Sequence, residues 1–151
     1  ILGWGNANDA YHQTASSPNG EGAQKSMQLA LEEAGLKPEY IDYINAHGTA
    51  TVNNDLSEGR AIETLFGKNQ LFSSTKGYTG HTLAAAGVIE CIYSILSIKN
   101  NTVFPTLNHN TLMPELKVKP VINIKKDITI NTVLTNSFGF GGNNATIIIG
   151  K

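Results

Sequence analysis

Two histidines and a lysine stand in short polar motifs whose spacing could support carbonyl chemistry. His47 lies in N-A-H-G-T-A-T at residues 45–51, and Lys76 and His81 lie in S-S-T-K-G-Y-T-G-H at residues 73–81. Each motif follows an apolar, strand-like run. Because strand ends hold side chains rigidly at one edge of a sheet, these three side chains could together bind and polarise a carbonyl or a carboxylate.

A glycine-dense segment near the C-terminus completes the candidate set. Residues 136–144 read N-S-F-G-F-G-G-N-N and lie between two strand-like runs. Such a turn can present backbone N–H groups as an oxyanion hole, or it can be an ordinary tight hairpin. The segment lacks the G-x-G-x-x-G spacing and the following helix of a dinucleotide-binding loop, so it does not indicate a nucleotide cofactor.

The polar side chains of these motifs have both a chemical and a structural interpretation. We expect His81 at the N-terminus of a helix over 82–99, where the helix dipole keeps the ring a neutral hydrogen-bond donor; capping that helix is the alternative. Thr49 and Thr51 offer hydroxyls to an amide- or hydroxyl-bearing substrate arm, or cap a helix. Lys76 could be a surface lysine, but no acidic residue lies within five positions of it.

Glu90 interrupts the apolar run L-A-A-A-G-V-I-E-C-I-Y-S-I-L. An acid in a buried helix must be paired or hydrogen-bonded. It could form a structural ion pair, support Lys76, or ligate a bound cation, and structural support is the favoured role. The neighbouring Cys91 is predicted to be a small core residue and not a nucleophile.

The apolar patterning predicts strands that alternate with helices. Strands are expected over residues 1–6, 40–46, 70–75, 129–137 and 144–149, and helices over 21–34, 54–66 and 82–99. Residues 100–127, with three prolines, should form a long irregular connection. The order β-α-β-α-β-α-β-β predicts an α/β fold: a mixed, mostly parallel sheet with helices on both faces and an antiparallel final pair.

The helix over 82–99 is apolar on nearly all sides, which predicts that it is buried on all sides. One sheet can cover only one of its faces. A second domain or a second copy must therefore cover the other. The chain also begins without a methionine, inside a strand-like run, so we expect it to be part of a longer protein.

Composition narrows the classes of function. The 151 residues, 40% of them hydrophobic, suffice for one domain with a core. A net charge of -1 gives no electrostatic footprint for nucleic acid or an anionic membrane. The single cysteine excludes an internal disulfide and fits a reducing compartment. No uninterrupted run reaches the ~18 apolar residues of a bilayer span, so no membrane partner is predicted.

Taken in order, these motifs resemble the C-terminal half of a β-ketoacyl-acyl-carrier-protein synthase, an elongating condensing enzyme of the thiolase superfamily. The likeness covers the whole chain, from D-A-Y-H-x-T (9–14) through both histidine motifs and F-P-T-L-N (104–108) to N-S-F-G-F-G-G-x-N (136–144). It implies that residues 1–151 form one thiolase-like domain, half of a five-layered α-β-α-β-α enzyme. The N-terminal half, with the nucleophilic cysteine, is absent from this sequence.

The resemblance implies a decarboxylative Claisen condensation and assigns roles within it. In the family, a cysteine takes an acyl group from carrier protein, malonyl-carrier loses CO2, and the resulting carbanion attacks the acyl thioester. His47 and His81 match the histidines that hold the malonyl thioester oxygen. Lys76 matches the lysine that supports the second histidine, and Glu90 an acid in the same network.

The substrate contacts and partners are implied in the same way. Thr49 and Thr51 match threonines that touch the phosphopantetheine arm. Phe138 matches the gating aromatic and one N–H of the oxyanion hole, and Gly139 belongs to the same substrate-binding turn. Substrates arrive on acyl carrier protein, so no resident cofactor and no catalytic metal is expected, although a structural monovalent cation is conceivable. The implied setting is a cytoplasmic homodimer in fatty acid or polyketide synthesis.

Three alternatives stay open. A non-catalytic chain-length-factor partner would bind carrier protein without condensing, but such partners tend to lose the histidines that this chain keeps. The second alternative is a ketosynthase domain of a multidomain polyketide synthase. A thiolase is the third, although it relies on a second cysteine near the C-terminus that this chain lacks. In each enzymatic case, the isolated chain should be inactive without its nucleophile.

Overall fold

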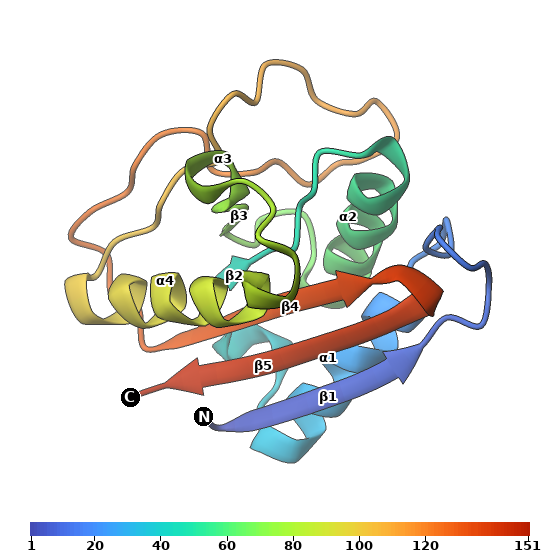
Figure 1. The fold of residues 1–151 in the computed structure, drawn as a ribbon. Coiled ribbons are helices and arrows are strands. Elements are labelled where there is room, and N and C mark those ends of the chain that lie inside the picture. The colour runs from blue at the N-terminus through green and yellow to red at the C-terminus, as the bar shows by residue number, and fades with distance from the viewer.

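The computed structural model describes all 151 residues. One five-stranded sheet forms its centre, and helices pack on both faces of it (Figure 1). The strands are β1 (Gly3–Asn8), β2 (Tyr43–Asn45), β3 (Phe72–Ser73), β4 (Thr132–Gly139) and β5 (Asn143–Gly150). The helices are α1 (Glu21–Ala34), α2 (Val52–Phe66), the short α3 (Lys76–Thr79) and α4 (Ala86–Asn100).

The sheet is mixed, as the alternation of elements predicts. Its strand order is β1-β5-β4-β2-β3. The pairs β2–β3 and β2–β4 are parallel, whereas β4–β5 and β1–β5 are antiparallel. Only β5 therefore runs against the other four strands, and the predicted antiparallel pair at the C-terminus is β4–β5.

The observed elements differ from the predicted ones mainly around the second histidine motif. The helix expected over 82–99 begins at Ala86 and is preceded by a short 3-10 turn, Leu83–Ala85. Gly80 and Leu83 have positive φ angles of 70° and 52°. Such left-handed residues interrupt a right-handed helix, so residues 82–85 of the expected helix do not belong to α4.

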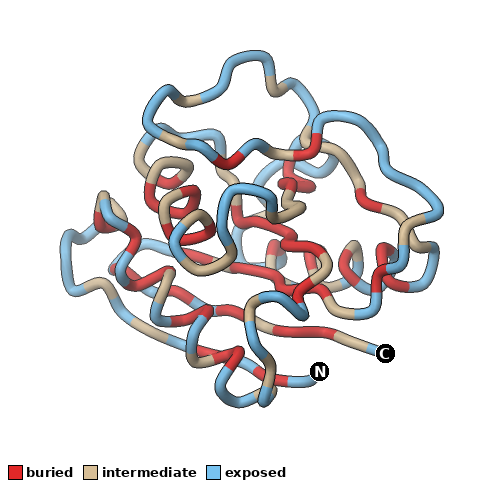
Figure 2. The backbone as a smooth tube through the Cα atoms, turned by 180° about the vertical axis from the view of Figure 1, so that it is seen from behind, coloured by how far each residue is buried: buried red, intermediate tan, exposed pale blue.

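Two apolar clusters hold the layers together. The first joins α1 and α2 to one face of the sheet through Met27, Ala30, Ile44, Ile62, Leu134 and Ile148. The second joins α4 and the 101–131 connection to the other face through Tyr43, Ile98, Val103, Val133 and Ile149. In Figure 2 the buried backbone runs through the centre of the molecule. The sheet thus has a separate apolar core on each face. These two cores fix the side of the sheet that β2 and β3 form.

Helix α4 turns its polar side inward and its apolar side outward. Glu90, Ser94 and Ser97 are buried, whereas Val88 and Ile92 are 66% and 51% exposed. By length and composition, Leu83–Asn100 could cross a membrane, with a mean hydropathy of 1.3, but core helices pass the same test. The prediction that the single chain leaves one face of this helix uncovered is confirmed, because Val88, Ile92 and Ile95 on that face are 49–66% exposed.

Charged substitutions on this face should make the isolated chain less prone to associate. We expect the wild-type chain to self-associate through the exposed side of α4, because water-exposed apolar patches drive association. The double variant Ile92→Lys, Ile95→Lys should weaken that association by about tenfold or more in analytical ultracentrifugation. Ile124→Lys, at an equally exposed isoleucine outside α4, is the control. A wild-type chain that stays monomeric at high concentration would contradict this expectation.

Candidate active site

The first histidine motif leaves the sheet at the end of β2 and is fixed from α2. His47 is 4% exposed. The Glu58 carboxylate accepts hydrogen bonds from the backbone N–H groups of His47 and Gly48, both at 2.9 Å. Asn136 on β4 donates to the same carboxylate at 3.0 Å. Glu58 therefore ties the His47 backbone to both α2 and β4.

Sequence analysis did not single out Glu58. The letters N-D-L-S-E show an acid one helical turn after Asn54, but they do not show that this acid points inward. Its carboxyl pKa is raised by burial, and hydrogen bonds from Gly48 and Asn136 lower it in part. A buried acid with three N–H donors is a positioning group, because all of its bonds are already committed.

Lys76 lies behind His47 and supports it directly. The Lys76 Nζ is 3.1 Å from His47 Nδ1, donates to the His47 carbonyl at 2.5 Å, and forms a buried ion pair with Glu90. It is 9% exposed, so it is not a surface lysine. The expectation that Lys76 supports the second histidine is wrong, because its ammonium contacts His47 and no contact with His81 is present. The predicted pairing of Glu90 with Lys76 is confirmed.

The two histidine rings are oriented so that each can donate a hydrogen bond from Nε2. An ammonium can only donate, so Nδ1 of His47 accepts from Lys76 and the ring proton lies on Nε2. Nδ1 of His81 accepts from the backbone N–H of Leu83 at 3.2 Å, which places its proton on Nε2 as well. The ring centroids are 5.4 Å apart at an interplanar angle of 85°. Two N–H donors thus stand close to each other.

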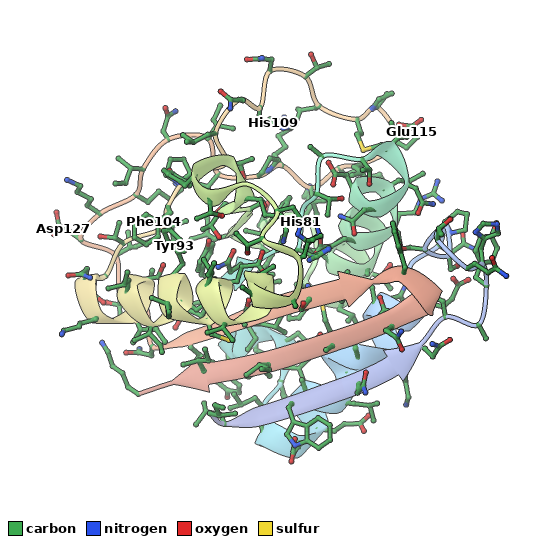
Figure 3. All side chains as sticks on the ribbon, in the orientation of Figure 1. His81, Tyr93, Phe104, His109, Glu115 and Asp127 are labelled. Carbon is green, nitrogen blue, oxygen red and sulfur yellow. The ribbon has the colours of Figure 1, made fainter.

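The position of His81 corrects one expectation. It lies outside α4, which begins at Ala86, so the dipole of that helix does not set its protonation. Its Nδ1 instead accepts from the N–H of Leu83, the first residue of the 3-10 turn that precedes α4. Figure 3 shows His81 between α2 and α4, and this residue is exposed. The donor role expected of His81 is therefore reached through a hydrogen bond and not through a helix terminus.

Burial and neighbouring cations hold His47 in its neutral form. Burial, the Lys76 charge and His81 together lower its pKa from 6.5 to about 3. Burial raises the pKa of Glu90 to about 7, although the hydrogen bond and charge of Lys76 lower it in part. A neutral His47 can donate to a developing oxyanion throughout the physiological pH range.

This shift predicts how stability depends on pH. The unfolded chain takes up a proton on His47 near pH 6.5, whereas the folded chain does so only near pH 3. The unfolded state therefore binds more protons between these values, and the His47 contribution to stability is lost as pH falls from 6.5 towards 3. NMR titration of the His47 ring should show a neutral imidazole at pH 5. A ring that titrates near its ordinary pKa would contradict the burial argument.

A pocket of about 650 Å³ opens in front of both histidines. Six of the predicted site residues line it: His47, Thr49, Thr51, His81, Phe138 and Gly139. Lys76 and Glu90 lie behind the pocket wall and do not line it. The structure therefore separates the predicted set into groups that face a ligand and groups that hold the first histidine in place.

The capping role considered for the threonines is confirmed for Thr51, and both threonines line the pocket. The Thr51 hydroxyl accepts from Asn54 N–H at 3.4 Å and caps α2. Thr49 and Thr51 hydroxyls are 3.0 Å apart, and both residues line the pocket. A capping role and a position on the pocket wall are therefore compatible.

The gating role expected of Phe138 does not fit its burial. Phe138 is 8% exposed, belongs to the first core cluster, and has its ring centroid 5.8 Å from that of His47. A side chain packed in this way cannot swing without opening the core. Phe140, which sequence analysis did not name, is 78% exposed and lines the same pocket, so it is the aromatic side chain free to move at its mouth.

The glycine turn is bound to the loop that follows β1. The Gly141 N–H donates to the Gln13 carbonyl at 2.7 Å, and the Asp9 N–H donates to the Gly142 carbonyl at 2.9 Å. Gly141 and Gly142 have positive φ angles of 79° and 74°, which favour glycine. The D-A-Y-H-x-T loop and the turn thus form one connected rim of the pocket.

Cys91 is half-buried against the second core cluster, away from this pocket. Burial and the nearby Glu90 raise the pKa of its thiol. A raised pKa disfavours the thiolate that a nucleophile requires. Cys91 thus packs against the core as predicted, although it is only half-buried.

The fold, the paired imidazoles and the glycine turn define a thiolase-fold condensing-enzyme domain. The family described as β-ketoacyl synthase, C-terminal domain, matches residues 1–110, and the chain belongs to this family. Over its whole length it is 46% identical to 3-oxoacyl-[acyl-carrier-protein] synthase 2 of Staphylococcus aureus (strain COL) and 44% identical to that of Coxiella burnetii (strain RSA 493 / Nine Mile phase I). It spans only 37% of the length of either protein.

Solved structures of similar proteins agree with this assignment. A β-ketoacyl synthase from Burkholderia phymatum STM815 superimposes on the whole chain with a TM-score of 0.95 at 36% identity, and 37% of that protein is covered. A type II polyketide synthase ketosynthase in complex with its acyl-carrier protein (AntDE:AntF) superimposes on 99% of the chain with a TM-score of 0.91 at 34% identity, and 38% of that protein is covered. The thiolase-type fold predicted from the motifs is therefore confirmed.

Proposed function

We propose that this chain is the C-terminal half of a 3-oxoacyl-[acyl-carrier-protein] synthase, an acyltransferase that joins an acyl thioester to malonyl-carrier protein. One observation carries the proposal: the rings of His47 and His81 lie 5.4 Å apart on one pocket, and each has its Nδ1 in a hydrogen bond, which leaves Nε2 to donate. Two such donors suit a single oxygen on which negative charge develops.

The chemistry follows from that pair of donors. When the C–CO2⁻ bond of a malonyl thioester breaks, its electron pair moves onto the thioester carbonyl and gives an enolate, and CO2 leaves. His47 and His81 would hold the enolate oxygen through their Nε2–H groups. The enolate carbon then attacks an acyl thioester on the cysteine of the N-terminal half. A C–C bond forms, the C–S bond breaks, and the cysteine leaves as a thiolate.

The remaining site residues would position these groups. Lys76, held by Glu90, keeps Nδ1 of His47 an acceptor, and Glu58 fixes the backbone beside it. Thr49 and Thr51 would contact the phosphopantetheine arm that carries the malonyl group into the pocket. These roles explain why the lysine and both acids are buried although none of them faces the pocket.

The partners follow from the surfaces that the chain leaves exposed. Residues 1–151 would form one domain, the C-terminal half of the protein. The exposed apolar face of α4 would pack on the N-terminal half. Acyl carrier protein would deliver substrate at the pocket rim. In the similar AntDE:AntF structure, a ketosynthase is in complex with its acyl-carrier protein. A homodimer in the cytoplasm completes the proposal.

A monovalent cation near Glu90 remains part of the proposal. The Glu90 Oε2 is buried and has no hydrogen-bond partner, whereas the other oxygen pairs with Lys76. A carboxylate oxygen is a suitable ligand for a hard cation. The ion would have a structural role and would take no part in the condensation.

A chain-length-factor partner is the second candidate. Ketosynthases paired with such factors are among the similar structures, for example the ApeO–ApeC complex from Xenorhabdus doucetiae. A partner that only shapes a tunnel has no use for two donors on one pocket or for the buried Lys76–Glu90 pair. The intact arrangement of these side chains therefore favours the enzyme.

A condensation assay separates the two candidates. The intact protein, with its N-terminal half, is mixed with acyl-carrier and malonyl-carrier protein, and mass spectrometry follows the carrier. Formation of 3-oxoacyl-carrier supports the enzyme. Carrier binding without product supports the chain-length factor. The isolated 151-residue chain serves as the control and should form no product, because it lacks the nucleophile.

A further inference from the structure

A second cavity lies behind the His47 segment, on the other side from the active-site pocket. It has a volume of about 170 Å³ and lies between α2 and the connection from α4 to β4. Figure 1 shows that connection arching over α3 and α2. Gly48 and Ala50 line this cavity, whereas His47 and Thr49 line the active-site pocket. We call it the rear cavity, and none of the proposed catalytic side chains lines it.

The polar end of the rear cavity contains a buried nitrogen without a partner. His109, on the arching connection in Figure 3, has a buried Nε2 that makes no hydrogen bond. Asp55 lines the same cavity, and the two groups interact electrostatically. Buried polar atoms in proteins nearly always have a hydrogen-bond partner. The chain offers His109 Nε2 none, so a molecule that enters the cavity has a polar group to bind.

Half of the lining residues are apolar, and the cavity is large enough for a small organic molecule. Ile62, Leu112, Met113, Leu116 and Val118 supply apolar surface. An apolar protein cavity of roughly 150 Å³ is known to hold benzene. Leu112 is 40% exposed, so the cavity reaches the surface and a ligand can enter beside it.

We propose that the rear cavity binds a small neutral molecule with an apolar body and a terminal hydroxyl group. The hydroxyl would donate to the Asp55 carboxylate and accept from an Nε2–H group of His109, which gives that nitrogen the partner it lacks. A carboxylate ligand is opposed by Asp55 and Glu58, since both acids line the cavity. An ammonium would lose its hydration against the apolar wall, which costs more than burying a neutral hydroxyl.

A ligand in the rear cavity would affect the position of His47 through Glu58. Glu58 lines the cavity, and its carboxylate accepts the backbone N–H groups of His47 and Gly48. A ligand that moves Glu58 therefore moves the catalytic ring. The effect on catalysis rests on the proposed function, whereas ligand binding in the rear cavity does not.

Methionine-methyl NMR on the intact protein tests the binding with 1-hexanol as the probe. Met113 lines the cavity, and Met27 is fully buried in the first core cluster, so the chain contains its own internal control. The Met113 methyl signal, assigned with Met113→Leu, should shift and saturate as hexanol is added, while the Met27 signal stays in place. Hexanoate, of equal chain length, should bind about tenfold more weakly because of its charge.

Two variants decide whether His109 holds the ligand. His109→Phe keeps a ring of similar shape without the nitrogen and should weaken hexanol binding about tenfold, which corresponds to one lost hydrogen bond. Asn110→Ala, at the exposed neighbouring residue, should leave the affinity within about twofold. A Met113 signal that never saturates, or equal affinities in the two variants, would overturn the proposal and leave a cavity that only water enters.

Discussion

Replacing His81 by alanine in the intact protein should lower the rate of malonyl-carrier decarboxylation by about 10²–10³-fold, with KM nearly unchanged. That factor is typical for removal of one donor from an oxyanion site, because such a donor acts mainly on the charge of the transition state. His81 is exposed and supports no core cluster, so the variant should fold normally. Release of CO2 from malonyl-carrier, followed under saturating substrate, is the measurement.

The first half of the reaction is the control for this variant. Acyl transfer from carrier protein to the cysteine of the N-terminal half needs no enolate, so His81→Ala should still become acylated at close to the normal rate. Mass spectrometry of the intact protein reads this step directly. A variant that loses acylation and decarboxylation equally would show a general structural fault, and the role assigned to His81 would fail.

Replacing Glu90 by alanine should destabilise the protein by about 3–5 kcal/mol, because it leaves the Lys76 ammonium buried without its counter-charge. Glu90 is 2% exposed and Lys76 is 9% exposed, so little water is available to take its place. Urea unfolding of the intact protein at a pH well above 7, where Glu90 is charged, measures the loss. The paired variant Lys76→Met, Glu90→Ala should recover part of it, since no charge is then left unpaired.

The second ion pair of the chain provides the matched control. The Lys117 Nζ is 3.8 Å from the Glu63 carboxylate, and the lysine side chain is 80% exposed. Exposed pairs of this kind contribute about 0–1 kcal/mol, so Glu63→Ala should shift the unfolding midpoint only slightly. Equal losses from Glu63→Ala and Glu90→Ala would mean that the buried pair does not stabilise the fold.

Local patterns were enough to predict most of the fold. Alternating apolar residues marked β2 and the paired strands β4 and β5, and helical spacing with Gly35 as a stop gave α1 its observed bounds. The outward apolar face of α4 could also be anticipated, because a helix apolar on nearly all sides needs two covering layers. The break between α3 and α4 could not, since it depends on the positive φ of Leu83, a residue that rarely adopts it.

The site was predictable in its residues but not in its connections. Sequence motifs placed His47, Lys76 and His81 at strand ends, and the structure brings the two histidines to one pocket. Which ring the lysine contacts depends on the path of the chain through α3, which no local pattern encodes. The other two errors arose because the sequence does not show which side chains are buried. Glu58 was overlooked as one acid among several on its helix, and Phe138 and Phe140 look alike in sequence but differ in exposure.

The central claim is that His47 and His81 act together on one oxygen. A double-mutant cycle on malonyl-carrier decarboxylation by the intact protein tests it most directly, with His47→Ala, His81→Ala and the double variant. Residues that act as a unit have strongly non-additive effects, so we predict that the double variant is within about tenfold of either single variant. Free-energy losses that simply add would show that the two rings act independently, and would contradict the account.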